Sequence, residues 1–455
     1  MCSLPFAIAA LGSCCLPAPT WAQNDLRSKV EQLAKPYLES ETVTGLFIGL
    51  IKGDQQTTVH LGSTGEGGKK PDDHTIYEIG SMSKVFTGLL LADAVVSKQL
   101  QLNDPAQKLL PVGVNMPKWK DREITLLEMS THSSGLPRLS DNMPFGSPTN
   151  PYADYPSKLA HEFLNKHKLR REPGEGEYSN FAVGLLGHLL SSHAKFSYDE
   201  LLKQRLTKPL GMNDTRVELT DDMRKRLATA HAEGGAKSEN WDFADMPGAG
   251  GIRSSIADLL KFAKANLKPP AGPVGETLNL AWQEHRKGTG EEFTMGLGWH
   301  FARDGHTRWH NGQTGGYHSM LMVSRKSDFA VVLLTNTSTD EVDQLAYQLV
   351  QTLMGAKAEP RVFAKTMKVS AEVMKGYVGK YNLAPNFLFT VTVKDERLMV
   401  ALTGQPALQV FAKSDTEWFY KAVDASLKFT NDAEGKCESL TLDQNGVQQT
   451  AKRIK

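Results

Sequence analysis

The hydrophobic pattern of the chain changes its period several times, and each change marks a predicted element. Residues 43–50 form an apolar run of β-forming residues, and a turn at 52–55 leads into a second run at 57–61, which predicts a hairpin. From residue 81 to residue 96 the apolar positions recur at helical spacing. We therefore expect a helix there, with Ser81 at or near its N-terminus.

Helical periodicity and long loops are typical of the residues from about 100 to 290. Strand-like runs then return at 293–299, 316–323 and 329–334. The last run is apolar throughout, as in a strand buried on both faces, and a closing helix is predicted at 342–353. We therefore expect an α/β (α+β) fold across residues 25–355. Both ends of this segment would build an antiparallel sheet flanked by helices, and the insertion at about 100–290 would form a mostly helical subdomain.

The last hundred residues differ in character from the rest of the chain. Residues 356–365 are typical of a linker, and short strand-like runs separated by turns such as Asn445-Gly446 follow. We expect a small antiparallel, barrel-like β-module at 366–455. The module contains Cys437, whereas the other three cysteines fall in the first fifteen residues, so we expect an unpaired thiol and no disulfide framework.

Composition and charge exclude several classes of protein. Of the 455 residues 40% are hydrophobic and 23% are charged, which is ordinary for a globular chain and excludes collagen, wholesale disorder and a polytopic membrane protein. Lys and Arg number 52 against 51 Asp and Glu, so the net charge of +1 gives no overall field for nucleic acid or anionic lipid. We expect no nucleic-acid partner and no transmembrane segment, and the oligomeric state stays open.

The N-terminus has the pattern of an export signal. Residues 4–19 are apolar and small but too few to span a bilayer, and residues 20–22 resemble a signal-peptidase site before the polar Gln23. We interpret residues 1–22 as a signal peptide of a periplasmic or secreted protein, although no Lys or Arg precedes the apolar region. The alternative is a lipobox that ends at Cys14, which would make the protein a lipoprotein.

Ser81 and Lys84 form an SxxK pair that suits acyl transfer. This chemistry needs a hydroxyl, a group that takes its proton, and donors for the oxyanion. A spacing of three residues on a helix places the Lys84 amine over the Ser81 hydroxyl, and partial desolvation would lower the pKa of the amine. The pair is weak evidence alone, because Ser81 could be a helix N-cap and Ser192 with Lys195 is a second match at a helix C-terminus.

Two further blocks follow the SxxK pair in order. Tyr178-Ser179-Asn180 is the only Tyr-x-Asn in the chain and stands at the opening of another apolar helix. A third block, from Trp309 to Gly316, contains His310, Gly312 and Gln313 and stands just before the returning strands, where its glycines would let the backbone approach a substrate closely. Three blocks in this order are far more specific than any one of them.

The ordered blocks resemble those of the serine β-lactamases, penicillin-binding proteins and related esterases and peptidases. The Tyr-x-Asn form resembles the class C-like branch, and the resemblance covers roughly residues 30 to 350. The C-terminal module is similar to the lipocalin-like β-domains appended to some of these hydrolases. Further stretches carry the resemblance: 103–105, 124–137 (with 131–137 inside it), 209–212 and 250–254.

The resemblance implies catalytic roles for three side chains. Ser81 would attack the carbonyl, and Lys84 would assist its deprotonation. Tyr178 would act as the general base or acid that shuttles the proton and, in β-lactamase-like members, would activate the deacylating water. Without the other blocks Tyr178 would be taken for a half-buried core tyrosine.

The resemblance also implies how a substrate would be held. Asn180 would hold Lys84 and the substrate amide, although a helix cap is its alternative role. His310 and Gly312 would form the third wall of the site, and the backbone N–H groups of Ser81 and Gln313 would make the oxyanion hole.

His310 is a departure from the classical β-lactamases, which carry a Lys at this place. A Lys is a permanent cation for a substrate carboxylate, whereas His is largely neutral near pH 7. Arg253 or Arg308 could supply the missing cation, or both could be solvated surface charges. The departure favours family VIII-type carboxylesterases, D-amino-acid peptidases and modest β-lactamases.

We therefore expect an exported serine hydrolase with a Ser81 acyl-enzyme, acting on β-lactams or peptidoglycan-like D-amino-acid amides. A carboxylesterase is the alternative enzyme, and a non-catalytic penicillin-binding sensor is the alternative of another class, against which Tyr178 argues. No cofactor and no metal are implied, since no HExxH occurs and His188 and His193 are five residues apart. The β-module would gate substrate, bind a partner or stabilise the chain.

Overall fold

The computed structural model describes residues 20–65, 70–144, 146–147, 149–290, 292–394, 396–405, 407–421 and 425–454, without the side chains of residues 20–24. Residues 1–19 of the predicted signal peptide, and with them the alternative lipobox at Cys14, lie outside the described residues, whereas its residues 20–22 begin the helix α1 (Thr20–Glu39). Across the described residues, no helix combines the length and the apolarity that crossing a bilayer requires.

An antiparallel sheet forms the centre of the catalytic part of the chain. Within the described residues it has six strands in the order β2-β1-β8-β7-β6-β5. The β1–β8 pairing joins the two ends of the segment, with Leu46 opposite Thr335, which confirms the expected sheet. The strands are β1 (Gly45–Lys52), β2 (Gln55–Gly62), β5 (His300–Phe301), β6 (Thr307–Gln313), β7 (His318–Ser324) and β8 (Phe329–Thr335).

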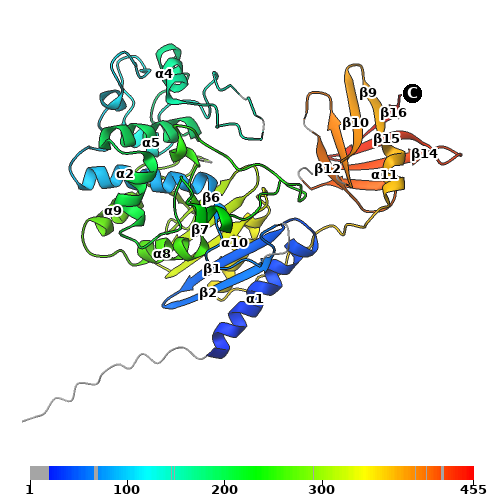
Figure 1. The fold of residues 1–455 in the computed structure, drawn as a ribbon, viewed down its shortest axis with the longest axis horizontal. Coiled ribbons are helices and arrows are strands. Elements are labelled where there is room, and N and C mark those ends of the chain that lie inside the picture. Colours follow the sequence, from blue (N-terminus) through cyan, green and yellow to red (C-terminus); the bar gives the residue numbers. More distant parts are fainter. Residues whose placement is uncertain are drawn as a thin grey trace, which may run out of the picture.

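Strand β8 is buried on both faces because it separates two hydrophobic cores. Its odd-numbered residues, such as Val331, pack with α1 (Thr20–Glu39) and α10 (Val342–Leu353). Its even-numbered residues, such as Val332, pack with the helices of the opposite face, since side chains of a strand alternate between faces. The sheet is thus sandwiched between helices, as Figure 1 shows.

The segment between the sheet halves is mostly helical, as expected. Helix α2 (Ser83–Val96) runs through its centre and is apolar on nearly all sides, which is typical of a buried helix. The other helices are α3 (Leu126–Ser130), α4 (Ser157–Lys166), α5 (Asn180–Ala194), α6 (Tyr198–Leu202), α7 (Asp221–Arg226), α8 (Ile256–Leu267) and α9 (Pro273–Trp282), with the short β3 (Tyr77–Glu78) and β4 (Arg253–Ser254) paired between them.

The strand predicted at 293–299 is wrong. This stretch consists of bends and irregular chain with isolated bridges only at Met295, and β5 begins only at His300. Gly298 explains the difference: its φ is +73°, and a Cβ there would lie 2.3 Å from the carbonyl oxygen of Lys84. The chain therefore bends close to the backbone of α2, where an extended strand with side chains would not fit.

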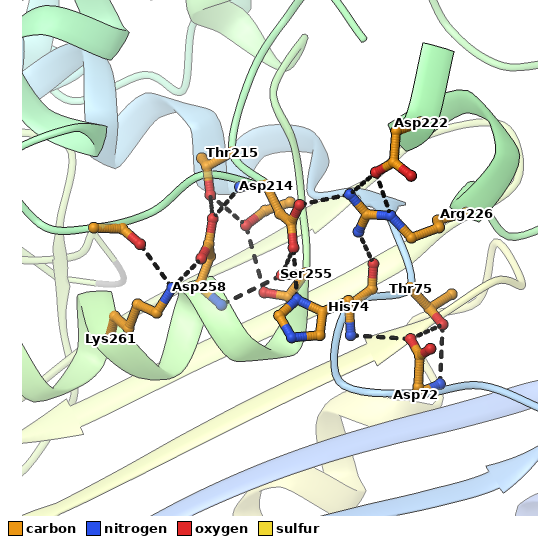
Figure 2. A network of polar contacts seen from close by, with 12 residues as sticks. Asp72, His74, Thr75, Asp214, Thr215, Asp222, Arg226, Ser255, Asp258 and Lys261 are labelled. Atoms are coloured by element: carbon orange, nitrogen blue, oxygen red, sulfur yellow. Dashed lines mark hydrogen bonds and ion pairs between the residues drawn. The ribbon is translucent and has the colours of Figure 1, made fainter. Parts of the chain in front are cut away.

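A polar network fixes the segment that leads into β3 (Figure 2). Asp214 lies at its centre, because its carboxylate is 2.8 Å from Nδ1 of His74 and 2.7 Å from Nη2 of Arg226. The amide of Asp214 donates to Asp258 in the first turn of α8 at 2.6 Å. The network therefore ties the chain before β3 to α7 and α8.

The C-terminal residues form a closed antiparallel barrel, confirming the expected module. Within the described residues it has eight strands, and β9 closes it by pairing with both β10 and β16. Cys437 is an unpaired, buried thiol in its core, and Arg397 donates to the carbonyl oxygen of Gly235 in the catalytic part at 3.0 Å. The module comprises α11 (Ala371–Tyr377), β9 (Gly379–Ala384), β10 (Phe387–Lys394), β11 (Arg397–Leu402), β12 (Leu408–Ala412), β13 (Glu417–Tyr420), β14 (Ala425–Asn431), β15 (Cys437–Gln444) and β16 (Val447–Arg453).

Candidate active site

Ser81 and Lys84 lie together at the start of α2. Ser81 belongs to a 3₁₀ turn, η2 (Gly80–Met82), that continues directly into α2, so the predicted helix begins two residues later than Ser81. Nζ of Lys84 lies 2.9 Å from Oγ of Ser81 and donates to the carbonyl oxygen of Ala249 at 2.6 Å. The structure thus brings the SxxK pair into hydrogen-bond contact.

The Lys84 side chain is completely buried, which changes its chemistry. Burial, with a smaller contribution from the charge of Arg138, holds the pKa of Lys84 well below its ordinary value. A lysine in such surroundings exists partly as the neutral amine, which can accept the proton of Ser81.

Tyr178 stands immediately before α5 and faces the same pair. Nζ of Lys84 lies 5.0 Å from the centroid of its ring, and the phenol is hydrogen-bonded to Ser81. Burial raises the pKa of Tyr178 well above its ordinary value, although the bond with Ser81 lowers it in part. Tyr178 is therefore a neutral phenol at neutral pH, suited to relaying a proton.

Asn180 is the first residue of α5, whose N-cap is Ser179: the Ser179 hydroxyl accepts the amide N–H of Ala182 at 2.9 Å. The Asn180 amide nitrogen donates to the hydroxyl of Tyr152 at 3.0 Å, and among the described residues its Oδ1 has no partner. Asn180 was expected to hold Lys84, but within the described residues Lys84 bonds to Ser81 and Ala249 and not to Asn180. Oδ1 of Asn180 is therefore a buried acceptor whose hydrogen-bonding capacity is unused within the described residues.

Gly312 and Gln313 on β6 lie directly against the turn that carries Ser81. A Cβ on Gly312 would come within 2.8 Å of the Ser81 amide nitrogen, and one on Gly80 would come within 2.6 Å of the Gln313 amide nitrogen. Gly80 also has a φ of +50°, which favours glycine. Because neither glycine has a side chain, β6 and the turn that carries Ser81 approach closely, and the backbone amides of Ser81 and Gln313 both lie at this contact.

His310 does not provide the cavity wall that was expected of it. Only 1% of its surface is exposed, its ring centroid lies 6.4 Å from that of Tyr178, and on β6 the described cavity lining begins at Asn311. Burial holds the pKa of His310 well below its ordinary value, and its Nδ1 donates to the carbonyl oxygen of Asn311. His310 is therefore a neutral packing residue under the site.

The two arginines considered as replacement cations are neither in the cavity nor solvated, so both expectations are wrong. Arg253 is buried against Glu78 and donates to the carbonyl oxygen of Trp241 at 2.6 Å. Arg308 is buried with its guanidinium carbon 3.3 Å from the centroid of Phe301, and this burial lowers its pKa to about 10. Glu78, a partner of Arg253, is 175 positions away in the sequence, whereas Phe301 is close to Arg308 along the chain.

Arg138 is a cation that the sequence did not single out. It is exposed, lines the cavity, and holds its guanidinium carbon 5.1 Å from the centroid of the Tyr178 ring. Within the described residues no ion pair involves Arg138. The one available signal was its place directly after the 131–137 stretch.

The cavity above Ser81 has a volume of about 730 Å³ and two unlike walls. One is aromatic: Tyr152 stacks on Phe243 with 4.6 Å between ring centroids and lies 5.5 Å from Trp241. The other is polar and is formed by the end of β6 from Asn311 to Gln313 and by Thr314, which follows it. Ser192 and Lys195 lie instead at the exposed C-terminal end of α5, as expected of a chance match.

The described residues hold no cluster of three or more His, Cys, Asp or Glu side chains that could bind a metal ion. The site itself consists of a serine in contact with a buried lysine and a tyrosine, at the start of a helix beside an antiparallel sheet. This fold and this site define a serine hydrolase.

The chain belongs to the Beta-lactamase family, whose match spans residues 30–353 and confirms the resemblance of the three blocks. Residues 364–453 match a second family, DUF3471, described as a domain of unknown function. The D-alanyl-D-alanine-carboxypeptidase/endopeptidase AmpH of Escherichia coli (strain K12) is 28% identical over 68% of this chain and 83% of its own. A beta-lactamase of Pseudomonas fluorescens is 27% identical over 61% and 74%, respectively.

Solved structures show the same fold. The D-alanine carboxypeptidase AmpC from Burkholderia cenocepacia covers 72% of this chain and 99% of its own, with a TM-score of 0.62 and 22% identity. A beta-lactamase/D-alanine carboxypeptidase from Pseudomonas syringae covers 74% and 100%, with a TM-score of 0.63 and 20% identity. At this identity the likeness establishes the fold alone.

Proposed function

We propose that the protein is an exported hydrolase that forms an acyl-enzyme on Ser81 from β-lactams or peptidoglycan-like D-amino-acid amides. The observation that carries the proposal is the 2.9 Å contact between Ser81 Oγ and the fully buried amine of Lys84. The similarity to AmpH and to a beta-lactamase supports the substrate class. Export is proposed from the signal-like residues 1–22.

Acylation would follow from the positions of three side chains. Ser81 Oγ attacks the carbonyl carbon while its proton passes to Nζ of Lys84. The amides of Ser81 and Gln313 stabilise the oxyanion, as oxyanion holes do in acyl transfer. When the tetrahedral intermediate collapses, the leaving nitrogen takes a proton relayed through the phenol of Tyr178. Water then attacks the ester carbonyl and gives its proton to the same relay through Tyr178. Ser81 Oγ leaves with a proton returned by Lys84, which restores the free enzyme.

Two polar groups on the described cavity wall would orient the substrate. Oδ1 of Asn180 accepts the amide N–H of the acyl group, since it has no partner among the described residues. Arg138 would bind a substrate carboxylate in place of the lysine that His310 replaces. Arg138 is exposed, so its charge is partly screened by solvent and its contribution is modest.

A carboxylesterase is the second candidate, favoured by one observation. His310 is buried and neutral at the place of the lysine, while Tyr152, Trp241 and Phe243 supply an apolar wall that suits uncharged acyl groups. A panel of nitrocefin, p-nitrophenyl butyrate and a D-Ala-D-Ala peptide, compared by kcat/KM, decides between the two functions. A dominant p-nitrophenyl butyrate activity would favour the esterase.

Covalent labelling tests the nucleophile directly. Incubation with a fluorophosphonate or a labelled penicillin is expected to give a mass adduct on Ser81, and S81A should lose adduct and turnover together. Ser192→Ala is the matched control, since Ser192 belongs to the second SxxK match outside the cavity. Unchanged turnover in S81A ends the proposal, and an adduct that persists for hours indicates a non-catalytic sensor instead.

The proposal also includes the domain boundaries along the chain. Residues 25–355 would form the catalytic domain with its helical insertion at about 100–290, residues 356–365 the linker and residues 366–455 the β-module. The family matches at 30–353 and 364–453 support these limits.

A further inference from the structure

We propose that His132 is the positioning residue for Tyr178: it holds the backbone on both sides of the tyrosine and packs against its ring. The inference rests on the catalytic role proposed above for Tyr178. His132 follows α3 in the chain and lies 47 residues before Ser179, to which it is hydrogen-bonded.

The backbone of His132 is placed in an unusual conformation that serves this contact. Its φ is +56°, in the left-handed region that side-chain-bearing residues seldom occupy, although His is among those found there more often. In this conformation its carbonyl oxygen accepts the amide N–H of Glu177 at 2.7 Å, while Nδ1 of its ring accepts the amide N–H of Ser179 at 3.1 Å. One residue thus binds both neighbours of Tyr178.

The ring of His132 also limits the orientation of the phenol. The centroids of the His132 and Tyr178 rings are 4.3 Å apart with an angle of 32° between the planes. His132 is only 3% exposed, and the ring of His300 lies beside the pair, 6.3 Å from each of the two rings and nearly parallel to both. The imidazole therefore forms a fixed support for Tyr178, whose hydroxyl contacts Ser81.

The hydrogen bond from Ser179 sets the protonation state of the imidazole. Because Nδ1 accepts a backbone N–H, the single ring proton of the neutral form must be on Nε2. Burial holds the pKa of His132 well below its ordinary value, so the ring stays neutral and Nδ1 stays an acceptor. Among the described residues Nε2 has no partner, and the polar contact of the ring is therefore directed at the segment of Tyr178.

Two substitutions distinguish the role of the Nδ1 acceptor of His132 from the role of its aromatic ring. His132→Asn keeps an acceptor, Oδ1, at the same number of bonds from Cα as Nδ1, and Asn tolerates the left-handed backbone. His132→Phe keeps the aromatic ring but leaves the buried amide of Ser179 without an acceptor. We expect H132F to lower kcat by about 100-fold, because a misplacement of about 1 Å has an effect of this size, and to leave KM within about threefold. H132N should retain kcat within about tenfold.

A double-mutant cycle with Tyr178→Phe distinguishes positioning from general stability. The kinetics use the best substrate of the three-substrate panel. If His132 acts through Tyr178, H132F should lower kcat about 100-fold in the wild-type background and by less than about threefold in the Y178F background. The same loss in both backgrounds, or no loss in the wild-type background, overturns the inference.

Two further results keep the test decisive. If H132F does not fold, His132→Gly takes its place in the cycle, since glycine removes both contacts and adopts a positive φ without strain. If Y178F alone leaves kcat unchanged, the proposed role of Tyr178 is wrong and the inference falls with it. If Y178F loses activity while the two backgrounds respond alike to H132F, only the inference on His132 fails.

Discussion

Gly312 on β6 lies so close to Ser81 that a Cβ at position 312 would come within 2.8 Å of the Ser81 amide nitrogen. The same Cβ would lie 2.0 Å from the carbonyl oxygen of Ile79, a backbone atom that cannot move aside alone. The approach of β6 to the turn carrying Ser81 therefore depends on the missing side chain. It also brings the Gln313 amide next to Gly80, where the oxyanion hole is proposed.

Gly312→Ala is expected to displace β6 from Ser81 and to lower kcat about 100-fold, the loss typical of removing one oxyanion donor. Gly305→Ala is a control on the same hairpin for the general effect of adding a methyl, since its Cβ would meet no described atom within 4 Å, although its φ of +68° adds backbone strain. Steady-state kinetics and thermal unfolding of both variants check the prediction. Full activity in G312A would contradict the close approach.

The buried amine of Lys84 makes stability depend on pH. The pKa of Lys84 in the folded protein is below its ordinary value of 10.5, so between these two values the unfolded chain binds a proton that the folded one does not. The resulting destabilisation is absent above pH 10.5 and grows as the pH falls, until the folded Lys84 is protonated as well. Lys84→Met should therefore be more stable than the wild type at pH 7, with a difference that shrinks toward pH 10.

Urea unfolding at pH 7 and at pH 10 measures this difference, and a stability gain that grows with pH would refute the assignment. Lys84→Arg provides a separate kinetic check. An arginine cannot lose its proton in this pH range, so K84R should not acylate at any pH tested, although it keeps the positive charge.

The position of Arg138 in the cavity wall predicts that its removal slows the hydrolysis of anionic substrates selectively. Replacing it by alanine should lower kcat/KM about tenfold for a β-lactam that bears a carboxylate, the size of one partly screened charge-assisted contact. Hydrolysis of p-nitrophenyl butyrate, which has no carboxylate, should change by less than about threefold. Arg308→Ala is the control, since Arg308 is a buried arginine that lies outside the described cavity wall. Equal losses on both substrates would exclude a charge contact.

Tyr178→Phe should affect the lifetime of the acyl-enzyme. The phenol contacts Ser81 and stays neutral, so its removal interrupts the proton relay but leaves the Ser81–Lys84 contact intact. We expect the penicillin adduct of Y178F to decay at least about 100-fold more slowly than that of the wild type, as for loss of a general acid or base. Mass spectrometry over time measures the decay, and an unchanged lifetime would remove Tyr178 from deacylation.

Much of the fold was predictable because its signals are local. The hairpin at the start of the sheet, the unbroken apolar run of β8 and the periodicity of α2 each depend on neighbouring residues, and each element formed. The predicted strand at 293–299 failed because Gly298 packs against the backbone of Lys84, a residue more than two hundred positions away. No pattern within the stretch itself reports such a contact.

The sequence by itself determined the class of protein and the pairing of Ser81 with Lys84, because a three-residue spacing at the start of one helix fixes their proximity. Only the tertiary structure decided which charges reach the cavity, placing Arg138 beside Tyr178 and burying Arg253, Arg308 and His310. It also decided that His132 holds Ser179 across 47 residues. Burial and long-range hydrogen bonds depend on how distant segments pack. The sequence around each of these residues contains no local pattern that indicates this packing.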